Sequence, residues 1–155
     1  MFAHLNSIGL YGMDAFEVHV EADISNGLPG FDVVGLPDTS VKESRDRVRS
    51  ALKNCGFTFP MSRITVNLAP ADKRKEGPIY DLPILLAILT ASGQLSCDLS
   101  DCAMIGELSL SGEIHGIRGV LPMAIHAKEL GYHRLFVPAV NAAEGAVVEG
   151  LEVYP

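Results

Sequence analysis

The side chains best suited to chemistry in this sequence are cations gathered in one segment. Residues 40–75 hold nine of the twelve lysines and arginines but only three acids, so this segment carries a charge of +6. The rest of the chain has three cations and sixteen acids, a charge of −13. Within one small chain, this asymmetry indicates a basic face directed at a polyanion or an acidic partner. The candidate contacts to a DNA backbone are Lys42, Arg45, Arg49, Lys53, Arg63, Lys73, Arg74 and Lys75.

Four of these cations fall in one row if residues 38–55 form a helix. At 100° per residue, Lys42, Arg45, Arg49 and Lys53 occupy a stripe about 80° wide beside an apolar face. Contacts of such a stripe to phosphates would be salt-dependent and blind to base sequence. The alternative is an ordinary solvated surface, balanced by acids from elsewhere in the chain. The net charge of −7 supports that alternative.

Other kinds of site lack their sequence signatures. There is no G-x-x-x-x-G-K-[ST] for nucleotide phosphates, no G-x-S-x-G and no H-E-x-x-H. The five histidines are scattered without metal-ligand spacing, and the three cysteines fit no zinc pattern. We therefore expect neither a metal site nor a catalytic site, and no cofactor bound by this chain.

The elements that would position the cations are marked by clear patterns. Ile64, Val66 and Leu68 alternate with polar residues and predict a strand over 63–69. The loop 70–80 follows, and then an apolar helix with Asp81 as N-cap and Gly93 as its stop. The loop is exposed in this prediction, and Asp72, Glu76 and Asp81 could neutralise it.

The basic helix has its own start and stop signals. Ser40 and Glu43 fit an S-x-x-E capping box, and Gly56 follows its end. A strand at 15–23 and a second at 31–35 flank two turn dipeptides and predict an antiparallel pair.

The remainder alternates short strands with helices. The expected elements are strands at 103–110, 112–119, 134–138 and 151–154, a helix at 121–130, and a short helix through Val148 capped by Asn141. This order favours an α/β fold of the α+β two-layer sandwich type, with a mixed sheet and the helices on one face. The length of 155 residues and a hydrophobic content of 48% fit a single domain, 1–155. No apolar run could span a membrane and no signal peptide is recognised, so we expect a cytoplasmic protein.

Four long stretches resemble the N-terminal domain of the magnesium-chelatase-like competence proteins, the ComM/YifB family. They are SNGLPGFDVVGLPDTSVKESRDRVRSALKNCGFTFP, RITVNLAPADKRKEGPIYDLPILLAILTASGQL, IGELSLSGEIHGIRGVLPMAIHAKELG and FVPAVNAAEGAVV. This resemblance implies the Lon-protease-like fold, which is also that of the second domain of ribosomal protein S5. It also implies an AAA+ ATPase module that is absent from this chain and that binds ATP and Mg²⁺.

The family is similar to hexameric branch-migration helicases that act in natural transformation and recombination. The resemblance therefore implies DNA, the AAA+ module and neighbouring subunits as partners. Two functions remain open: a domain that contacts the DNA backbone, or a structural domain that packs between motor subunits without touching DNA. Porphyrin chemistry rests on the family's name alone.

Lon-type proteases use a Ser–Lys dyad, and this sequence departs from it at both positions. Lys75-Glu76-Gly77-Pro78 resembles the first motif, but Ile79 stands where the serine would be. Arg118-Gly119-Val120 resembles the second, but Leu121 stands where the lysine would be. Because the reaction needs a hydroxyl activated by an amine, we expect a scaffold without peptidase activity.

Overall fold

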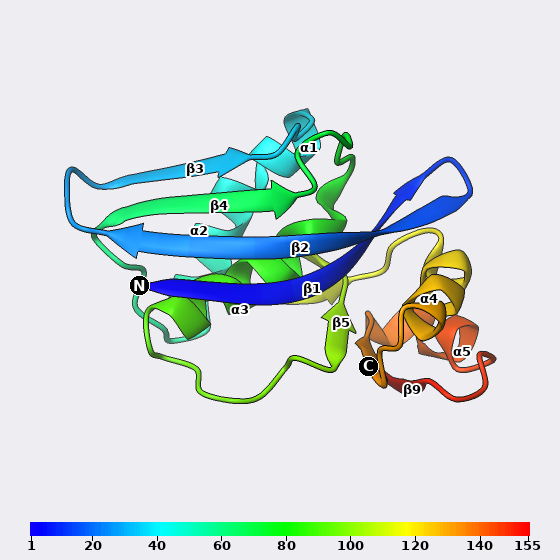
Figure 1. Cartoon of the computed structure of the whole chain (residues 1–155). Helices are drawn as coiled ribbons and strands as arrows, with labels where there is room; N and C mark the ends of the chain where they lie inside the picture. The colour runs from blue at the N-terminus through cyan, green and yellow to red at the C-terminus, as the bar shows by residue number, and fades with distance from the viewer.

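A seven-stranded mixed sheet runs through the computed structural model, which describes all residues from 1 to 155 (Figure 1). The strand order is β3-β4-β2-β1-β5-β8-β9. The β1–β2 and β2–β4 pairs are antiparallel and the other pairs are parallel. The strands of this sheet are β1 (Phe2–Tyr11), β2 (Asp14–Ser25), β3 (Gly30–Val34), β4 (Arg63–Ala69), β5 (Cys102–Met104), β8 (Arg134–Phe136) and β9 (Glu152–Tyr154). The mixed sheet expected from the sequence is thus confirmed.

Two features of the N-terminal half differ from the prediction. Strand β1 was not predicted, although it pairs with β2 along its whole length. The predicted antiparallel pairing of β2 with β3 is wrong, because β4 lies between them and β3 pairs with β4 in parallel. The sequence patterns mark β2, β3 and β4 but do not say which of them pair. The connection from β3 to β4 contains α1 and α2 and is long enough for β4 to lie between β2 and β3.

The basic segment forms two helices in succession, α1 (Thr39–Lys42) and α2 (Ser44–Asn54). The predicted capping box is wrong: Asp38 is the N-cap, and its Oδ1 accepts from the backbone N–H of Val41 at 2.8 Å. The predicted end is correct, because Gly56 has a φ of 87° just after the C-cap, a conformation that glycine adopts without strain.

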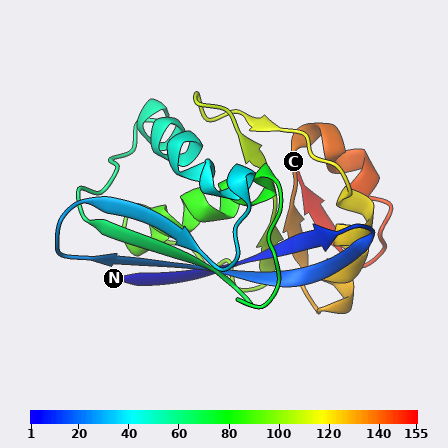
Figure 2. The same ribbon diagram turned by 90° about the horizontal axis from the view of Figure 1, so that it is seen from above.

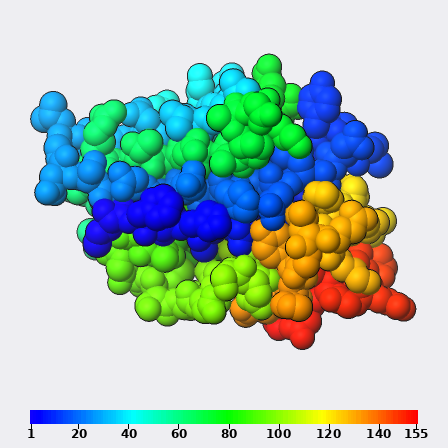
Figure 3. Space-filling view, viewed as in Figure 1, coloured from blue at the N-terminus to red at the C-terminus, as the bar shows by residue number.

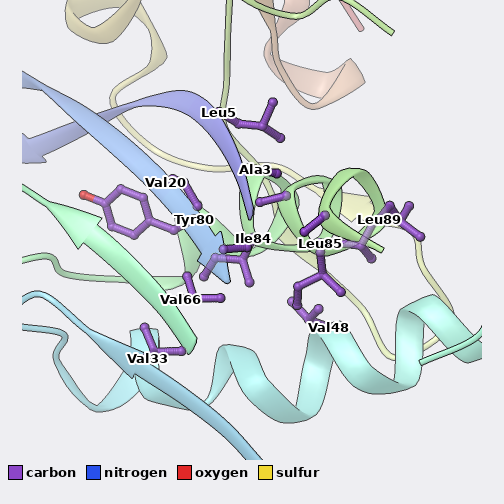
Figure 4. Close-up of a cluster of buried hydrophobic side chains, with 14 of the residues drawn as sticks. Ala3, Leu5, Val20, Val33, Val48, Val66, Tyr80, Ile84, Leu85 and Leu89 are labelled. Atoms are coloured by element: carbon purple, nitrogen blue, oxygen red, sulfur yellow. The ribbon is translucent and has the colours of Figure 1, made fainter. Parts of the chain in front are cut away.

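Helix α3 (Asp81–Ala91) follows the short 3₁₀ helix η1 (Pro78–Tyr80). Asp81 was predicted as its N-cap, but Tyr80 occupies that position and the carboxylate of Asp81 is fully buried among other partners. The helix is buried on most sides because Ile84, Leu85 and Ile88 pack into the main core. Figure 4 shows this core between α2, α3 and the strands, with Tyr80 beside Val20.

The sheet is covered on both faces, by different helices. In β5, Cys102 and Met104 join the core under α2 and α3, whereas Ala103 between them joins a second core with α4 (Val120–Glu129). Because neighbouring residues of a strand point to opposite faces, α4 lies on the face opposite α3. The predicted placement of all helices on one face therefore holds for α1, α2 and α3 but not for α4 (Figure 2).

The C-terminal region is built from short elements. Strands β6 (Glu107–Leu108) and β7 (Ile114–His115) form a separate hairpin, and η2 (Ala139–Asn141) leads into α5 (Ala142–Gly145). Asn141 precedes α5 as predicted, but its side chain binds the backbone N–H and C=O of Ile117 instead of capping the helix. Helix α4 leaves part of its face of the sheet open, and side chains of β1 and β2 reach the surface there (Figure 3).

Candidate nucleic-acid interface

The four predicted stripe residues are all exposed along the outer side of α1 and α2. Arg45 is held in place: its Nε donates to the carbonyl of Lys42 at 3.1 Å, and a terminal nitrogen donates to the carbonyl of Phe31 at 3.5 Å. From Lys42 to Lys53 there are eleven steps of about 1.5 Å, so the row is about 16 Å long. One DNA strand has a phosphate about every 3.4 Å along its axis, so the row is long enough to follow several phosphates.

None of the four stripe cations has a carboxylate within 4.0 Å. The ion pairs of the basic segment involve Arg47, Arg63 and Arg74 instead. Asp46 is exposed on the same helix but forms no ion pair. The charge of the stripe is therefore unpaired within the chain.

Arg49 and Lys53 also line a hollow of about 310 Å³. The guanidinium of Arg49 lies 5.0 Å from the ring centre of Phe59, in a cation–π arrangement. The other lining residues, Pro29, Gly30, Pro60, Met61 and Ser62, are uncharged, so Arg49 and Lys53 supply all the charge of this hollow. Phe59 was not predicted as part of the site, because nothing in the local pattern places residues 59–62 against α2.

The other four predicted cations are in different settings. Arg63 donates to Asp32 at 2.9 Å, and Arg74 lies 3.4 Å from a carboxylate oxygen of Glu76. Lys73 is exposed and its Nζ lies 5.0 Å from the ring centre of Phe16. Lys73 and Arg74 line a second hollow, of about 320 Å³, with the end of the β1–β2 hairpin. This hollow shares no residue with the one beside α2, so Lys73 and Arg74 form a second group, separate from Arg49 and Lys53.

Lys75 is a correction, since it is fully buried and is not available to a phosphate. Its backbone N–H donates to Leu36 and its carbonyl accepts from Asp38, both at 3.0 Å, so this part of the loop docks against the β3–α1 connection. Its Nζ donates to the carbonyl of Pro70. Burial lowers the pKa of Lys75, and the nearby charge of Lys73 adds to this, whereas Asp72 opposes it.

Asp81 does not neutralise the loop, because it is the centre of a buried cluster on the inner side of α2. Its carboxylate accepts from Ser44 Oγ at 2.5 Å, from Arg47 Nε at 2.6 Å and from the N–H of Leu108 at 3.1 Å. Burial opposes the charge of Arg47, but the hydrogen bond and charge of Asp81 outweigh it and raise the pKa of Arg47. This cluster joins α2, α3 and β6 and has a structural role.

The two positions of the dyad carry no reactive groups. Ile79 packs against both cores, and its carbonyl accepts from the N–H of Gly106 at 2.9 Å. Leu121 lies in the first turn of α4, where its N–H donates to Glu144 at 3.0 Å. No group of three or more His, Cys, Asp and Glu side chains is arranged to hold a metal ion. No helix combines the length and apolarity that crossing a bilayer requires.

The fold belongs to a class that includes the Lon proteases. The chain is 27% identical over 125 residues to the Lon protease of Leptospira interrogans, which covers 79% of this chain and 15% of that protein. Within this class, residues 20–141 match the family described as subunit ChlI of Mg-chelatase. The chain belongs to this family.

Relatives within this magnesium-chelatase-like family include the proteins named ComM and YifB. The competence protein ComM of Haemophilus influenzae is 47% identical over 92% of this chain and 28% of its own length. YifB of Salmonella typhimurium is 49% identical over 88% of this chain and 27% of its own length. An uncharacterised protein of Mycobacterium tuberculosis is 44% identical over 95% of this chain. The chain thus spans less than a third of the length of these relatives.

Proposed function

We propose that this domain contacts the phosphate backbone of DNA through the α2 stripe, defined as Arg45, Arg49 and Lys53 on α2 together with Lys42 at the end of α1. The observation that carries the proposal is four exposed cations in one row without a carboxylate within 4.0 Å. An unpaired row keeps its full charge for a ligand, whereas paired cations such as Arg63 must first give up their partners. A contact limited to phosphates would accept any base sequence.

In this proposal the domain is an accessory part of a longer ATP-driven protein that acts on DNA during competence. The length of the relatives and the name of the Haemophilus influenzae protein support that setting. ATP and Mg²⁺ would bind outside these residues, in an AAA+ module, and neighbouring subunits would complete a hexamer. The domain itself would be non-catalytic, because Ile79 and Leu121 offer neither a nucleophile nor a base.

A second function, packing within a larger assembly, is favoured by a specific feature. A hollow of about 280 Å³ lies beside the C-terminus, and nine of its ten lining residues are hydrophobic, among them Leu82, Leu86 and Phe136. An exposed apolar hollow is typical of a surface that another domain covers. This surface is separate from the α2 stripe, so a single domain could serve both functions.

The test is fluorescence anisotropy of the domain with single-stranded, duplex and branched DNA at increasing salt. We expect affinity to fall with salt, and to fall further in a variant with all four stripe residues changed to Ala. The matched control changes Lys73 and Arg74 to Ala, which removes cations from the other group. Absence of binding at low salt, or equal loss in both variants, would contradict the proposal and leave the assembly function.

A further inference from the structure

A cluster on the open part of the sheet brings together two histidines that are fifteen residues apart in the sequence. His4 lies on β1 and His19 on β2, and His4 Nε2 is 3.0 Å from His19 Nδ1. Asn6 Oδ1 lies 3.2 Å from the same Nδ1. Since β1 was not predicted, this pair of histidines could not be predicted from their spacing in the sequence.

The far side of the His19 ring faces a carboxylate. His19 Nε2 lies 3.1 Å from Glu17 Oε1, and the other oxygen of Glu17 accepts from the hydroxyl of Tyr132 at 2.7 Å. An ionised carboxylate accepts hydrogen bonds and donates none. The carboxylate therefore favours the tautomer of His19 with its proton on Nε2, and in the neutral ring Nδ1 is then an unprotonated lone pair.

The near side of the ring faces a second acceptor. The amide nitrogen of Asn6 donates to the backbone carbonyls of Ser100 and Cys102, at 3.4 and 3.3 Å. These two bonds fix the orientation of the amide, so its oxygen points at His19 Nδ1. A neutral His19 cannot satisfy Glu17 and Asn6 together, because it has one proton for two acceptors. In the neutral pair, Nδ1 can accept a proton donated by His4 Nε2, which leaves Asn6 Oδ1 without a donor at this point. A cation at Nδ1, either a proton or a metal ion, would satisfy the ring nitrogens and the amide oxygen together.

We propose that His4 Nε2, His19 Nδ1 and Asn6 Oδ1 bind a late first-row divalent metal ion, of the class of Ni²⁺ and Cu²⁺. For a metal about 2.1 Å from each ligand, separations of 3.0 and 3.2 Å correspond to angles of about 90° and about 100° at the metal. Such angles suit octahedral or tetragonal coordination better than the tetrahedral coordination of structural zinc. Imidazole nitrogens are good ligands for both ions.

The surroundings fit a metal ligand in two further respects. A carboxylate that accepts from the second nitrogen of a ligating histidine orients the ring, and Glu17, itself held by Tyr132, is placed to do this. The site is also open, because His4 and His19 line a shallow hollow with Phe2, Glu21 and Ala69, which leaves room for water ligands. The site lies on β1 and β2, away from the α2 stripe, and does not depend on the proposed function.

The experiment uses protein without a purification tag, in a background with the exposed Cys55 and Cys97 changed to Ser. Ni²⁺ binding is measured by calorimetry, and Cu²⁺ binding by electron paramagnetic resonance, which counts the nitrogen ligands. We expect one site with two imidazole nitrogens. His4→Ala and His19→Ala should each remove one nitrogen and weaken binding about tenfold or more. Glu17→Gln should weaken binding by about 10–100-fold while both nitrogens stay bound.

His115→Ala, which changes an exposed histidine on β7, is the matched control and should bind as the parent does. A different binding mode would use the amino terminus and His4 as copper ligands. Asn6→Ala distinguishes the two modes, because only the proposed site loses affinity in that variant. Circular dichroism of each variant verifies folding. Binding that survives His19→Ala would overturn the proposal. So would nitrogen-15 shifts that report His19 protonated at both nitrogens and unchanged by metal, because the cation would then be a proton.

Discussion

Arg47 and Arg49 are two residues apart on α2, and their settings are opposite. Arg47 points inward, where its guanidinium binds the fully buried carboxylate of Asp81. Arg49 points outward, lies over Phe59 and has no carboxylate partner. Counting cations along the sequence therefore does not locate a phosphate-binding surface. The partners that each cation has within the chain decide which ones remain available.

The largest expected effect is on stability, from the inner side of α2. Arg47→Ala would leave the carboxylate of Asp81 buried without its cation, and breaking a buried pair in this way costs about 3–5 kcal/mol. Arg49→Ala removes an exposed side chain and should change stability by no more than about 0.5 kcal/mol. Denaturant unfolding of both variants measures the difference. Equal losses would show that the two sides of the helix are not distinct.

The second prediction concerns DNA binding by the outer side. Changing Lys42, Arg45, Arg49 and Lys53 to Ala should lower the slope of log affinity against log salt by about 0.9 for each duplex phosphate contact that is lost. Stability should remain near that of the parent, because these side chains are exposed. Anisotropy titrations at several salt concentrations give the slope. An unchanged slope would place the DNA contact elsewhere or exclude it.

Lys75 extends the comparison to the loop, since it is a buried cation without a carboxylate partner. Its pKa in the folded protein is lowered from 10.5, so between the two pKa values the unfolded chain binds more protons than the folded protein. The stability contributed at this residue therefore rises with pH through that window and is lower below it.

Lys75→Met should remove this pH dependence and leave DNA binding as it is in the parent. The measurement is the difference in unfolding free energy between parent and variant from pH 7 to pH 11, which cancels the titration of the tyrosines. A constant difference, or weaker DNA binding by the variant, would place Lys75 among the surface contacts after all.

The smallest expected effect comes from Asp46, which is exposed on α2 beside the stripe. The carboxylate of Asp46 would repel a phosphate bound at the stripe. Asp46→Asn removes this repulsion and should raise the affinity for DNA about twofold at low salt. Glu149→Gln removes a charge from an exposed position near the C-terminus and is the matched control. If both changes raised affinity equally, net charge rather than the stripe would govern binding.

Elements with strong local patterns could be predicted from the sequence, and their partners could not. Strand β4 and helix α3 follow directly from their apolar spacing. Strand β1 escaped prediction because Leu5, Asn6, Ser7 and Ile8 are all buried, so its residues do not alternate between apolar and polar. Whether β3 pairs with β2 or with β4 depends on contacts between distant segments, which periodicity does not record.

The same limit applies to the candidate site. The helical spacing of the four stripe residues is sufficient to place them on a common side of the successive helices α1 and α2. The burial of Lys75 depends on docking against Leu36 and Asp38, nearly forty residues earlier, and no local pattern reports it. Asp81 was assigned to the end of a helix on its residue type, but tertiary contacts with Ser44 and Arg47 override that preference.

The insertion of β4 between β2 and β3 has a consequence for how the chain folds during synthesis. The β1–β2 hairpin closes through a two-residue turn and can form as soon as it leaves the ribosome. Strand β3 emerges next, but its only neighbour, β4, follows after α1 and α2 have been made. Until Ala69 emerges, β2 and β3 both present open edges, so the nascent chain is exposed to mispairing and aggregation during this interval.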